Sequence, residues 1–428
     1  MAYSGYLEDD RRLPSVERRM KAEKPTVLIL YHYFYPDDVA SALHFSDLCK
    51  ELCARGWRVI AMPCNRGCRR ETDRFTRWEH WNGVEIRRVW RPRFRQAGKI
   101  GRLLNAVWMI VAWSIAALRR GSLSRVDVLI VGTDPVLSVL VARVWKALRS
   151  RTKIVHWCFD LYPDAAVADG ILRDGTLLHR VIQRLLLKAY DRCDLIVDIG
   201  ACMRKKLQAS APGIEKTTLT PQALVEPDDW LPVDFDERRR VFGDTRLALL
   251  YSGNFGRAHC CDMFLQLARR LRTEDVKFAF SIRGNRADAV AQAISRGGKN
   301  VVSVPFASLE RLQARLAAAD IHLVSLREGW TGAAVPSKFF GSLAIGRPVI
   351  FAGSEHSAIA EWIRTYDVGW VLTEQTLEYV ARRLLELSDR ADQLWALQLH
   401  CHQVYRDVFS REKTMDSWDA AIRRLVSA

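Results

Sequence analysis

The most informative part of this sequence is VPSKFFGSLAIGRPVI, residues 335–350. Pro336 suits the first turn of a helix because proline has no amide hydrogen to lose there. Ser337 then lies where the free backbone N–H groups of a helix start gather, and such a start attracts an anion. Lys338 adds a positive charge beside those amides. The Gly-Arg-Pro that follows ends the helix and leads into a buried strand at residues 349–352, so the stretch predicts half of a pocket for a diphosphate.

A second loop in the carboxyl-terminal half has the same chemistry. Residues 247–252 form an apolar run, typical of a strand buried on both faces, and residues 253–257 (GNFGR) follow directly. Glycines at 253 and 256 let backbone amides approach a pyrophosphate, with Arg257 as a charge partner. Each motif is weak when taken alone, because an ordinary helix or an ordinary glycine turn gives the same pattern.

Length and charge limit the possibilities further. A chain of 428 residues is long enough for two domains of roughly 200 residues each. Lys and Arg number 65 against 49 Asp and Glu, which gives a net charge of +16. Residues 66–125 carry 15 basic and 4 acidic side chains and supply +11 of that charge. Such a local field favours a phosphate-rich partner, either anionic lipid or nucleic acid.

An uncharged run lies inside this basic stretch. Residues 103–118 include Trp108 and Trp113 and are flanked by Arg102 and by arginines at 119 and 120. A helix needs about 20 apolar residues to cross a bilayer, so this run is too short to span one comfortably. It is either an in-plane helix at a membrane surface or a buried helix of the first domain, and the basic field favours the membrane.

The first half of the chain predicts a domain of alternating strands and helices. An apolar strand at residues 27–31, a helix at 42–55 and a strand at 58–62 make a right-handed crossover unit. Further buried strands are expected at residues 127–131 and around 153–158. A last strand at residues 195–198 is expected to close this domain.

Three segments resemble glycosyltransferase family 4, whose members have the two-domain GT-B architecture. They are the stretch quoted first, residues 251–256 (YSGNFG) and residues 160–172 (DLYPDAAVADGIL). The last of these is similar to enzymes that build bacterial surface polysaccharides. The resemblance covers about residues 27–425 and is more specific in the second domain. It implies an α/β fold of two Rossmann-like, doubly wound parallel-sheet domains that face a cleft.

The resemblance also implies a reaction. It predicts a retaining transferase of hexosyl or N-acetylhexosaminyl type that uses a nucleoside-diphosphate sugar as donor. The acceptor would be a membrane-associated, polyprenyl-linked glycan, and the leaving phosphate itself would help to deprotonate it. No metal and no cofactor are expected, in line with the metal-independent GT-B group.

The resemblance assigns roles to particular residues. Lys338 and Arg257 would act on the diphosphate, and Asp160 would orient a sugar or acceptor hydroxyl. For Asp160 the alternative is an aspartate that caps a turn before a proline. The donor site would also include Gly253, Asn254, Gly256, Arg283, Glu328, Pro336 and Ser337. For Arg283 and Glu328, which follow predicted strands, an exposed loop position without function is the alternative.

The chain departs from the family pattern at three places. Residues 39–42 replace the usual glycine pair of the first loop, which leaves close backbone approach there in doubt. The lysine expected shortly after Arg257 is missing, and Lys338 would compensate for it. The two glutamates usual around the central helix correspond to Ala333 and Gly341, so no residue is assigned to the donor ribose.

The domain boundaries follow from composition and from proline positions. We expect a flexible leader at residues 1–24, a first domain at 25–225, a linker at 226–244, a second domain at 245–410 and a last helix at 411–428. The resemblance implies that the first domain binds the acceptor, that the second binds the nucleotide sugar, and that the last helix crosses back to the first domain.

Two other functions stay open. The basic stretch fits a nucleic-acid- or membrane-binding module without catalysis, although it has no nucleic-acid recognition motif and surrounds an apolar run that nucleic acid does not need. A sugar-nucleotide epimerase on the same architecture is the other alternative. The polar amino terminus and ten cysteines in or beside apolar segments predict a cytoplasmic protein, peripheral on the inner face of the membrane. Its expected partners include an anionic membrane surface, bound through residues 66–125, and no nucleic acid.

Overall fold

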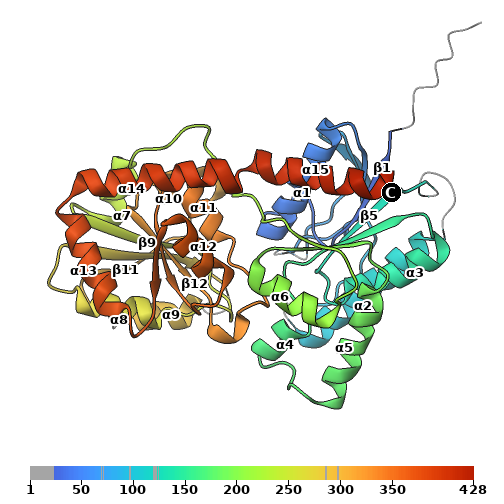
Figure 1. Ribbon diagram of the computed structural model, residues 1–428, viewed down its shortest axis with the longest axis horizontal. Coiled ribbons are helices and arrows are strands. Elements are labelled where there is room, and N and C mark those ends of the chain that lie inside the picture. The colour runs from blue at the N-terminus through green and yellow to red at the C-terminus, as the bar shows by residue number, and fades with distance from the viewer. Residues whose placement is uncertain are drawn as a thin grey trace, which may run out of the picture.

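The chain forms two lobes that lie side by side, and helices cover both faces of the sheet in each lobe (Figure 1). The computed structural model describes residues 24–68, 70, 72–95, 98–118, 123, 125–284, 287–295 and 298–428. The leader expected at residues 1–24 lies outside the described residues, apart from Lys24.

Among the described residues, the first lobe contains an eight-stranded sheet with strand order β3-β4-β2-β1-β5-β6-β7-β8. Neighbouring strands are parallel except β3 and β4, which form an antiparallel hairpin at one edge. Three strands, β1, β5 and β7, are buried along their whole length, as expected for parallel strands covered on both faces. The elements are β1 (Thr26–Leu30), α1 (Ala40–Ala54), β2 (Arg58–Ala61), β3 (Trp78–Trp81), β4 (Val84–Arg87), α2 (Lys99–Ala116), β5 (Val128–Gly132), the 3-10 helix η1 (Ser138–Leu140), α3 (Val141–Leu148), β6 (Lys153–Trp157), α4 (Asp164–Ala168), α5 (Leu177–Tyr190), β7 (Leu195–Asp198), α6 (Ala201–Ser210) and β8 (Lys216–Thr218).

The second lobe has, within the described part of the chain, a six-stranded parallel sheet with strand order β11-β10-β9-β12-β13-β14. Its elements are α7 (Phe235–Phe242), β9 (Leu247–Asn254), α8 (Asp262–Arg270), β10 (Val276–Arg283), α9 (Ala287–Ser295), β11 (Val301–Val304), α10 (Leu309–Ala317), β12 (Ile321–Ser325), the 3-10 helix η2 (Glu328–Trp330), α11 (Lys338–Ala344), β13 (Val349–Ala352), α12 (Ala358–Tyr366), β14 (Gly369–Leu372), α13 (Leu377–Ser388), α14 (Ala391–Val404), the π-helical turn η3 (Tyr405–Phe409) and α15 (Arg411–Ser427). The quoted stretch thus forms α11 and β13, as the sequence predicts.

The structure differs from the sequence-based expectation at three points. The first lobe does not end at β7, because α6 and the edge strand β8 follow it. The hairpin β3–β4 was not predicted, since its strands WEHW and VEIR carry few aliphatic residues and lie among arginines. The expected linker at 226–244 contains α7, whose residue Phe242 packs with Leu250 and Ala279 of the second sheet. The domain boundaries themselves stay a prediction.

The last helix, α15, lies against the first lobe (Figure 1). The indole N–H of Trp57 donates to Asp419 Oδ1 at 2.6 Å. Trp418 packs edge-on against Trp157 of β6, with 4.8 Å between the ring centroids. The chain therefore passes between the lobes twice, once before α7 and once between α14 and α15.

The two crossings are held together by Glu226. Its carboxylate accepts hydrogen bonds from the Tyr405 hydroxyl at 2.8 Å and from the Arg411 N–H at 3.1 Å. The Tyr405 oxygen also accepts a hydrogen bond from the Ala223 N–H at 3.2 Å. The segment before α7 and the segment around η3 are thus joined by polar contacts.

The arginine of the quoted Gly-Arg-Pro segment has a structural position. Arg347 is fully buried, and its guanidinium donates to the carbonyl oxygens of Ala317, Ala319 and Leu231 at 2.9, 2.6 and 3.1 Å. Burial lowers the pKa of Arg347 to about 10, and the nearby Asp320 opposes this. Arg347 therefore ties α10 and the segment before α7 to the start of β13.

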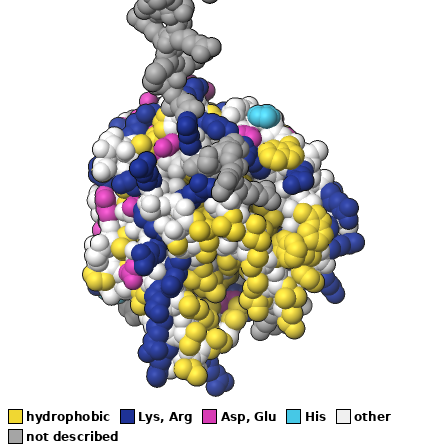
Figure 2. Space-filling model, turned by 90° about the vertical axis from the view of Figure 1, so that its right-hand side faces the viewer, with side chains coloured by type: hydrophobic (Ala, Val, Ile, Leu, Met, Phe, Trp, Pro, Cys, Tyr) yellow, Lys and Arg dark blue, Asp and Glu magenta, His cyan; other side chains and the backbone are white. Residues whose placement is uncertain are grey.

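The outer end of the first lobe exposes many large apolar side chains (Figure 2). Much of this surface comes from α2, which buries Met109 and Trp113 but exposes Val107 and Val111 on another face. One face of this helix is therefore buried in the first lobe, as one sequence-based alternative for residues 103–118 requires, whereas contact of the exposed face with a membrane stays a prediction. None of the helices described by the structure is long and apolar enough to cross a membrane.

Candidate active site

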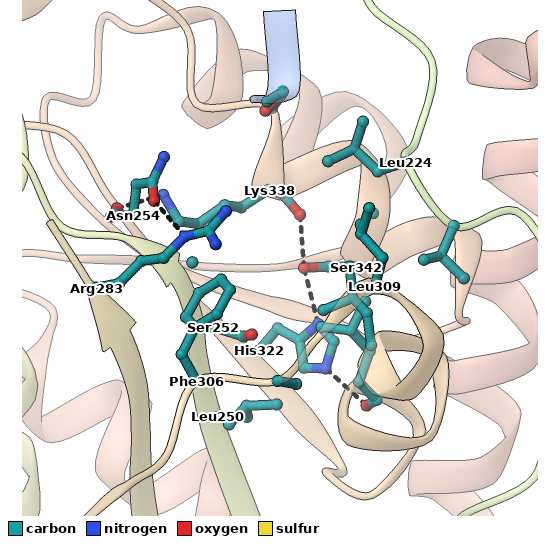
Figure 3. A pocket seen from close by; sticks show the side chains of 18 of the residues that line it. Leu224, Leu250, Ser252, Asn254, Arg283, Phe306, Leu309, His322, Lys338 and Ser342 are labelled. Carbon is teal, nitrogen blue, oxygen red and sulfur yellow. Dashed lines mark hydrogen bonds between the residues drawn. The ribbon is translucent and has the colours of Figure 1, made fainter. Parts of the chain in front are cut away.

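A cavity of about 560 Å³ lies between the lobes, at the carboxyl ends of β9 and β10. Asp38 and Ala40 line it from the first lobe, and Leu224 and Val225 line it from the segment that joins the lobes. The second lobe supplies the remaining wall, with side chains from β9, β10, α10, β12 and α11 (Figure 3). Carboxyl ends of parallel strands are the usual ligand-binding edge of such sheets.

Lys338, the first residue of α11, reaches across to the end of β9. Its ammonium donates to the Asn254 carbonyl oxygen at 3.0 Å and to His259 Nε2 at 3.3 Å. His259 presents Nε2 as an acceptor because its Nδ1–H donates to the Ser325 carbonyl at 2.6 Å. Burial, with the charge of Lys338 next, lowers the pKa of His259 to about 3, so this ring is neutral. Burial also lowers the pKa of Lys338 to about 8, so its ammonium form still dominates at pH 7.

Gly253 makes this position of Lys338 possible. Its φ is +138°, and a Cβ atom added there would lie 2.4 Å from Cε of Lys338. Such a distance is shorter than any van der Waals contact, so a larger residue would displace the lysine. Gly256 differs, because a Cβ there would meet nothing within 4 Å.

Arg283, at the end of β10, forms a second positive group of the cavity wall. Its Nε–H donates to Asn254 Oδ1 at 2.9 Å, and its guanidinium lies over the Phe306 ring at 4.0 Å from the centroid (Figure 3). One guanidinium nitrogen lies 4.0 Å from Asp38 of the first lobe. Arg283 and Phe306 together present a flat, charged surface beside Lys338.

The inner end of the cavity contains His322 and Ser342. The His322 Nε2–H donates to the Leu316 carbonyl at 3.0 Å, and Nδ1 lies 2.9 Å from the Ser342 hydroxyl. Burial lowers the pKa of His322 to about 3, so this ring is neutral. The same hydroxyl lies 2.9 Å from the carbonyl oxygen of Lys338 (Figure 3). His322 and Ser342 therefore support the first turn of α11 from inside the cavity.

The structure brings together five of the residues singled out in the second half of the sequence. Gly253, Asn254, Arg283, Ser337 and Lys338 all line the cavity.

The other predicted residues lie outside the cavity lining. Arg257 donates to the Asp169 carboxylate of the first lobe at 3.2 Å, so it joins the lobes. Glu328 lies on the exposed helix η2, and the Gly256 backbone precedes Arg257 in the same loop. Pro336 is buried directly before Ser337.

Asp160 lies where the two lobes meet. It forms an isolated antiparallel bridge with Ala334, and the N–H of the next residue, Leu161, donates to the Ala333 carbonyl at 2.8 Å. Burial, together with the charge of Asp134, raises the pKa of Asp160 to about 6. Its side chain borders a small cavity of the first lobe that Tyr162 also lines, rather than the donor-side cavity.

Asp134 is a candidate functional residue that the sequence analysis missed. It follows β5, and its Oδ1 lies 3.4 Å from Nδ1 of the buried His32, which follows β1. Burial disfavours a charge on His32, but Asp134 and Cys64 outweigh it and raise the pKa of His32 to about 9. The available signal was the position of both residues directly after buried parallel strands.

His259 and Phe306 were also missed as site residues. His259 closes the loop after β9, and Phe306 follows β11. In the sequence, only the position of His259 and Phe306 after predicted strands could have indicated a role in the site, because a single His or Phe does not form a recognisable motif. Across the described residues, no group of three or more His, Cys, Asp or Glu is arranged to hold a metal ion. The ten cysteines, all of which are described, are unpaired.

The chain is similar to two curated bacterial proteins. It is 25% identical over 355 residues to WbjE of Pseudomonas aeruginosa, named as a glycosyltransferase, covering 78% of this chain and 84% of WbjE. It is 25% identical over 360 residues to WcaI of Escherichia coli K12, named as a colanic acid biosynthesis glycosyl transferase, covering 79% of this chain and 86% of WcaI. No protein-family model matches the chain.

Solved structures share the whole two-lobed fold. Sucrose-phosphate synthase from Thermosynechococcus elongatus superposes with a TM-score of 0.72 at 14% identity, over 94% of this chain and 99% of that one. HepE of Anabaena, solved with UDP and glucose, gives 0.64 at 11% identity over 94% and 100% of the two chains. WaaG, a glycosyltransferase involved in lipopolysaccharide biosynthesis, gives 0.63 at 15% identity over 93% and 99%.

The fold is therefore the GT-B fold of glycosyltransferases, as the resemblance predicted. The named relatives support a glycosyltransferase in polysaccharide biosynthesis. Membership of family 4 stays a prediction.

Proposed function

We propose that this protein transfers a sugar from a nucleoside-diphosphate sugar to a glycan acceptor during polysaccharide biosynthesis. The donor would lie in the cavity of the second lobe, with its diphosphate beside Lys338 and Gly253. The structural neighbour HepE was solved with UDP in two structures, which supports a nucleotide as the ligand of this fold.

The observation that carries the proposal is the fixed position of Lys338. Two of its three N–H groups are used by Asn254 and His259, so the ammonium is held in place before any ligand arrives. When the glycosidic bond breaks, negative charge develops on the leaving diphosphate, and a pre-positioned cation stabilises that charge. Arg283 would lie against the nucleoside end, stacked on Phe306.

The proposed chemistry retains the anomeric configuration and rests on the resemblance to family 4. The bond between the anomeric carbon and the diphosphate oxygen breaks, the acceptor oxygen bonds to that carbon from the same face, and the acceptor proton passes to the leaving phosphate. No metal and no cofactor take part in this proposal. Asp160 would orient the acceptor or the sugar, and its pKa of about 6 leaves it largely ionised at pH 7.

The acceptor in this proposal is a polyprenyl-linked glycan, and the transferred group is a hexose or an N-acetylhexosamine. The enzyme would lie on the inner face of the membrane as a peripheral protein and use the basic residues 66–125 against anionic lipid. The net charge of +11 on this stretch supports the lipid contact.

Replacing Lys338 tests the proposal. Lys338→Ala should lower turnover at least tenfold, because one charge-stabilising donor is lost at the leaving group. The matched control is Lys299→Ala, which removes an exposed lysine of the same lobe. Turnover is followed as nucleoside diphosphate released from a panel of nucleotide sugars, with and without lipid-linked acceptor. Equal turnover in both variants would show that the cavity does not hold the diphosphate. Conversion of the donor to an epimer in the absence of acceptor would show an epimerase instead of a transferase.

A further inference from the structure

Helix α2 exposes an apolar stripe along its whole length. The exposed residues recur every three or four positions, as one face of a helix requires: Ile100, Leu103, Leu104, Val107, Val111, Ile115 and, just past the helix, Leu118. The opposite face is buried and includes Met109 and Trp113. A helix that is apolar on all sides is normally surrounded by protein or lipid, yet one side of α2 meets no protein in the described structure.

Helix α5 carries a second stripe of the same kind. Leu177, Leu178, Val181 and Leu185 are all more than two-fifths exposed, and Leu177 reaches 77%. Beside this stripe, Arg180, Arg184 and Lys188 repeat at four-residue intervals and are exposed. The helix contains no acidic residue. An apolar stripe flanked by a basic stripe is typical of helices that lie on an anionic membrane surface.

The two helices lie on the same end of the molecule. Both pack on α3 and on η1, which form the floor between them. Figure 2 views this end directly and shows two apolar ridges with a hollow between them, bordered by Lys and Arg side chains. Trp90 and Phe94, which precede α2 in the chain, are exposed too, and Trp108 Nε1 donates to the Trp90 carbonyl at 2.6 Å.

The floor between the helices adjoins Asp160. A cavity of about 10 Å³ is lined by Leu137 and Val139 of the η1 region, Leu186 of α5, and Tyr162 and Asp160. Burial, and then the charges of Asp160 and Asp134, raise the pKa of Tyr162, whereas the charge of Arg102 on α2 lowers it. Arg102 therefore acts electrostatically on the cavity that Tyr162 and Asp160 line. The acidic residues of the cleft and the apolar ridges thus adjoin.

We propose that α2 and α5 together form one membrane-docking surface that lies in the headgroup region of an anionic bilayer, and that lipid-held acceptor approaches Asp160 from this side of the first lobe. Residues 66–125 alone do not make this surface, because one of its two apolar stripes belongs to α5. The acceptor route rests on the proposed transferase function, whereas membrane docking does not.

Charge selects the bilayer among the possible occupants. The apolar side chains extend along two helices that would lie in the plane of the membrane rather than cross it. The basic stripe of α5 is complementary to phosphate headgroups. A second copy of this chain would bring the same basic stripe against itself, and the like charges would repel. A group of exposed apolar side chains that lie next to one another, bordered by charged residues, is typical of an interaction surface.

Vesicle binding tests the docking surface. The full chain is sedimented with vesicles of phosphatidylcholine, with or without phosphatidylglycerol. Val107→Asn with Val111→Asn on α2, and separately Leu178→Asn with Leu185→Asn on α5, should each lower binding to the anionic vesicles at least tenfold, because two inserted side chains become polar. These positions are exposed, so the changes should not disturb folding, which the melting temperature checks.

Control variants keep the test specific. Phe235→Asn with Leu399→Asn removes exposed apolar side chains from the second lobe and should leave vesicle binding unchanged. Arg180→Glu with Arg184→Glu should abolish the preference for phosphatidylglycerol, whereas Arg269→Glu with Arg272→Glu in the second lobe should not.

Each outcome decides the proposal. Loss of binding from both helix variants supports it, whereas loss from the α2 variant alone would remove α5 from the surface and overturn it. The proposal would also be overturned if the wild-type protein does not bind anionic vesicles. It would be overturned as well if the wild-type protein is a dimer in solution and the α2 or α5 variants are monomers. The melting-temperature shift with nucleotide sugars is measured in parallel. If that shift is absent while vesicle binding follows the prediction, the transferase function fails and the docking surface stands.

Discussion

The cavity wall of the second lobe and the outer end of the first lobe are built on opposite principles. Around Lys338, a few polar groups are fixed by hydrogen bonds to the backbone and to each other, and Gly253 makes room for the lysine side chain. On α2 and α5, many apolar side chains are exposed and few polar bonds hold them. The arrangement around Lys338 suits a small charged ligand that binds in one fixed position. The arrangement on α2 and α5 suits a large partner surface that binds through contact area and charge alone. Substitutions should therefore act sharply in the second lobe and gradually in the first.

The largest expected effect comes from removing the space at Gly253. Gly253→Ala should lower turnover about 100-fold, because the new methyl group displaces the charge of Lys338 and because the φ of +138° at this position is strained for any residue with a Cβ. Gly256→Ala is the matched control, since a Cβ at that position meets open space, and it should stay within about threefold of wild type. The comparison is made on nucleoside diphosphate release. Similar losses in both variants would mean that the whole loop, rather than the lysine, contacts the donor.

Asp160→Asn should lower turnover about tenfold at pH 7, because a carboxylate that orients the acceptor or the sugar is lost. The pKa of Asp160 is about 6, so its carboxylate forms as pH rises through 6, and wild-type activity should rise there. Activity should fall again as pH rises through about 8, where Lys338 loses its proton. The pH profile of kcat/KM measures both limits. In Asp160→Asn, the rise of kcat/KM through pH 6 should disappear while the fall through about pH 8 remains. A profile identical to that of the wild type would contradict the role of Asp160.

Arg283→Ala should raise the KM for donor about fivefold and change kcat little, because stacking on Phe306 contributes equally to bound donor and to the transition state. Steady-state kinetics with varied nucleotide sugar separates the two constants. Phe306→Leu should give a similar increase, and the double variant should show less than the product of the two effects, because the side chains act as a pair. A fall in kcat alone would place Arg283 at the leaving group instead.

The smallest effect is expected at Arg257. This residue was predicted to hold the diphosphate, but it pairs with Asp169 in an exposed ion pair between the lobes. Exposed pairs contribute little, so Arg257→Ala should change turnover less than about threefold. A loss as large as that of Lys338→Ala would show that Arg257 swings to the donor during the reaction and would restore the sequence-based assignment.

The second lobe was more predictable from sequence than the first. Gly253 lies at the carboxyl end of a buried parallel strand, and Lys338 lies at the start of the helix before another such strand; both belong to short motifs. Because neighbouring strands are parallel, such residues lie at one edge of the sheet. Arg283 was found for the same reason. Its stacking on Phe306 was not, because the two belong to different strand ends and no sequence pattern fixes the distance between side chains.

The first lobe resisted prediction for physical reasons. The uncharged run in α2 is apolar on both faces, so periodicity could not say which face meets protein. The stripe on α5 gains its meaning only when α3 and η1 place it next to α2. The pairing of His32 with Asp134 joins residues 102 positions apart, and neither carries a motif of its own.

The two chain crossings beside Glu226 restrict how the lobes separate. Two tethers fixed close together allow rotation about a common axis but oppose sliding and twisting, so the far rim of the cleft must travel furthest. The Arg257–Asp169 pair lies between the lobes and has to break in that movement. Added salt weakens such a pair, so release of product should become faster as ionic strength rises.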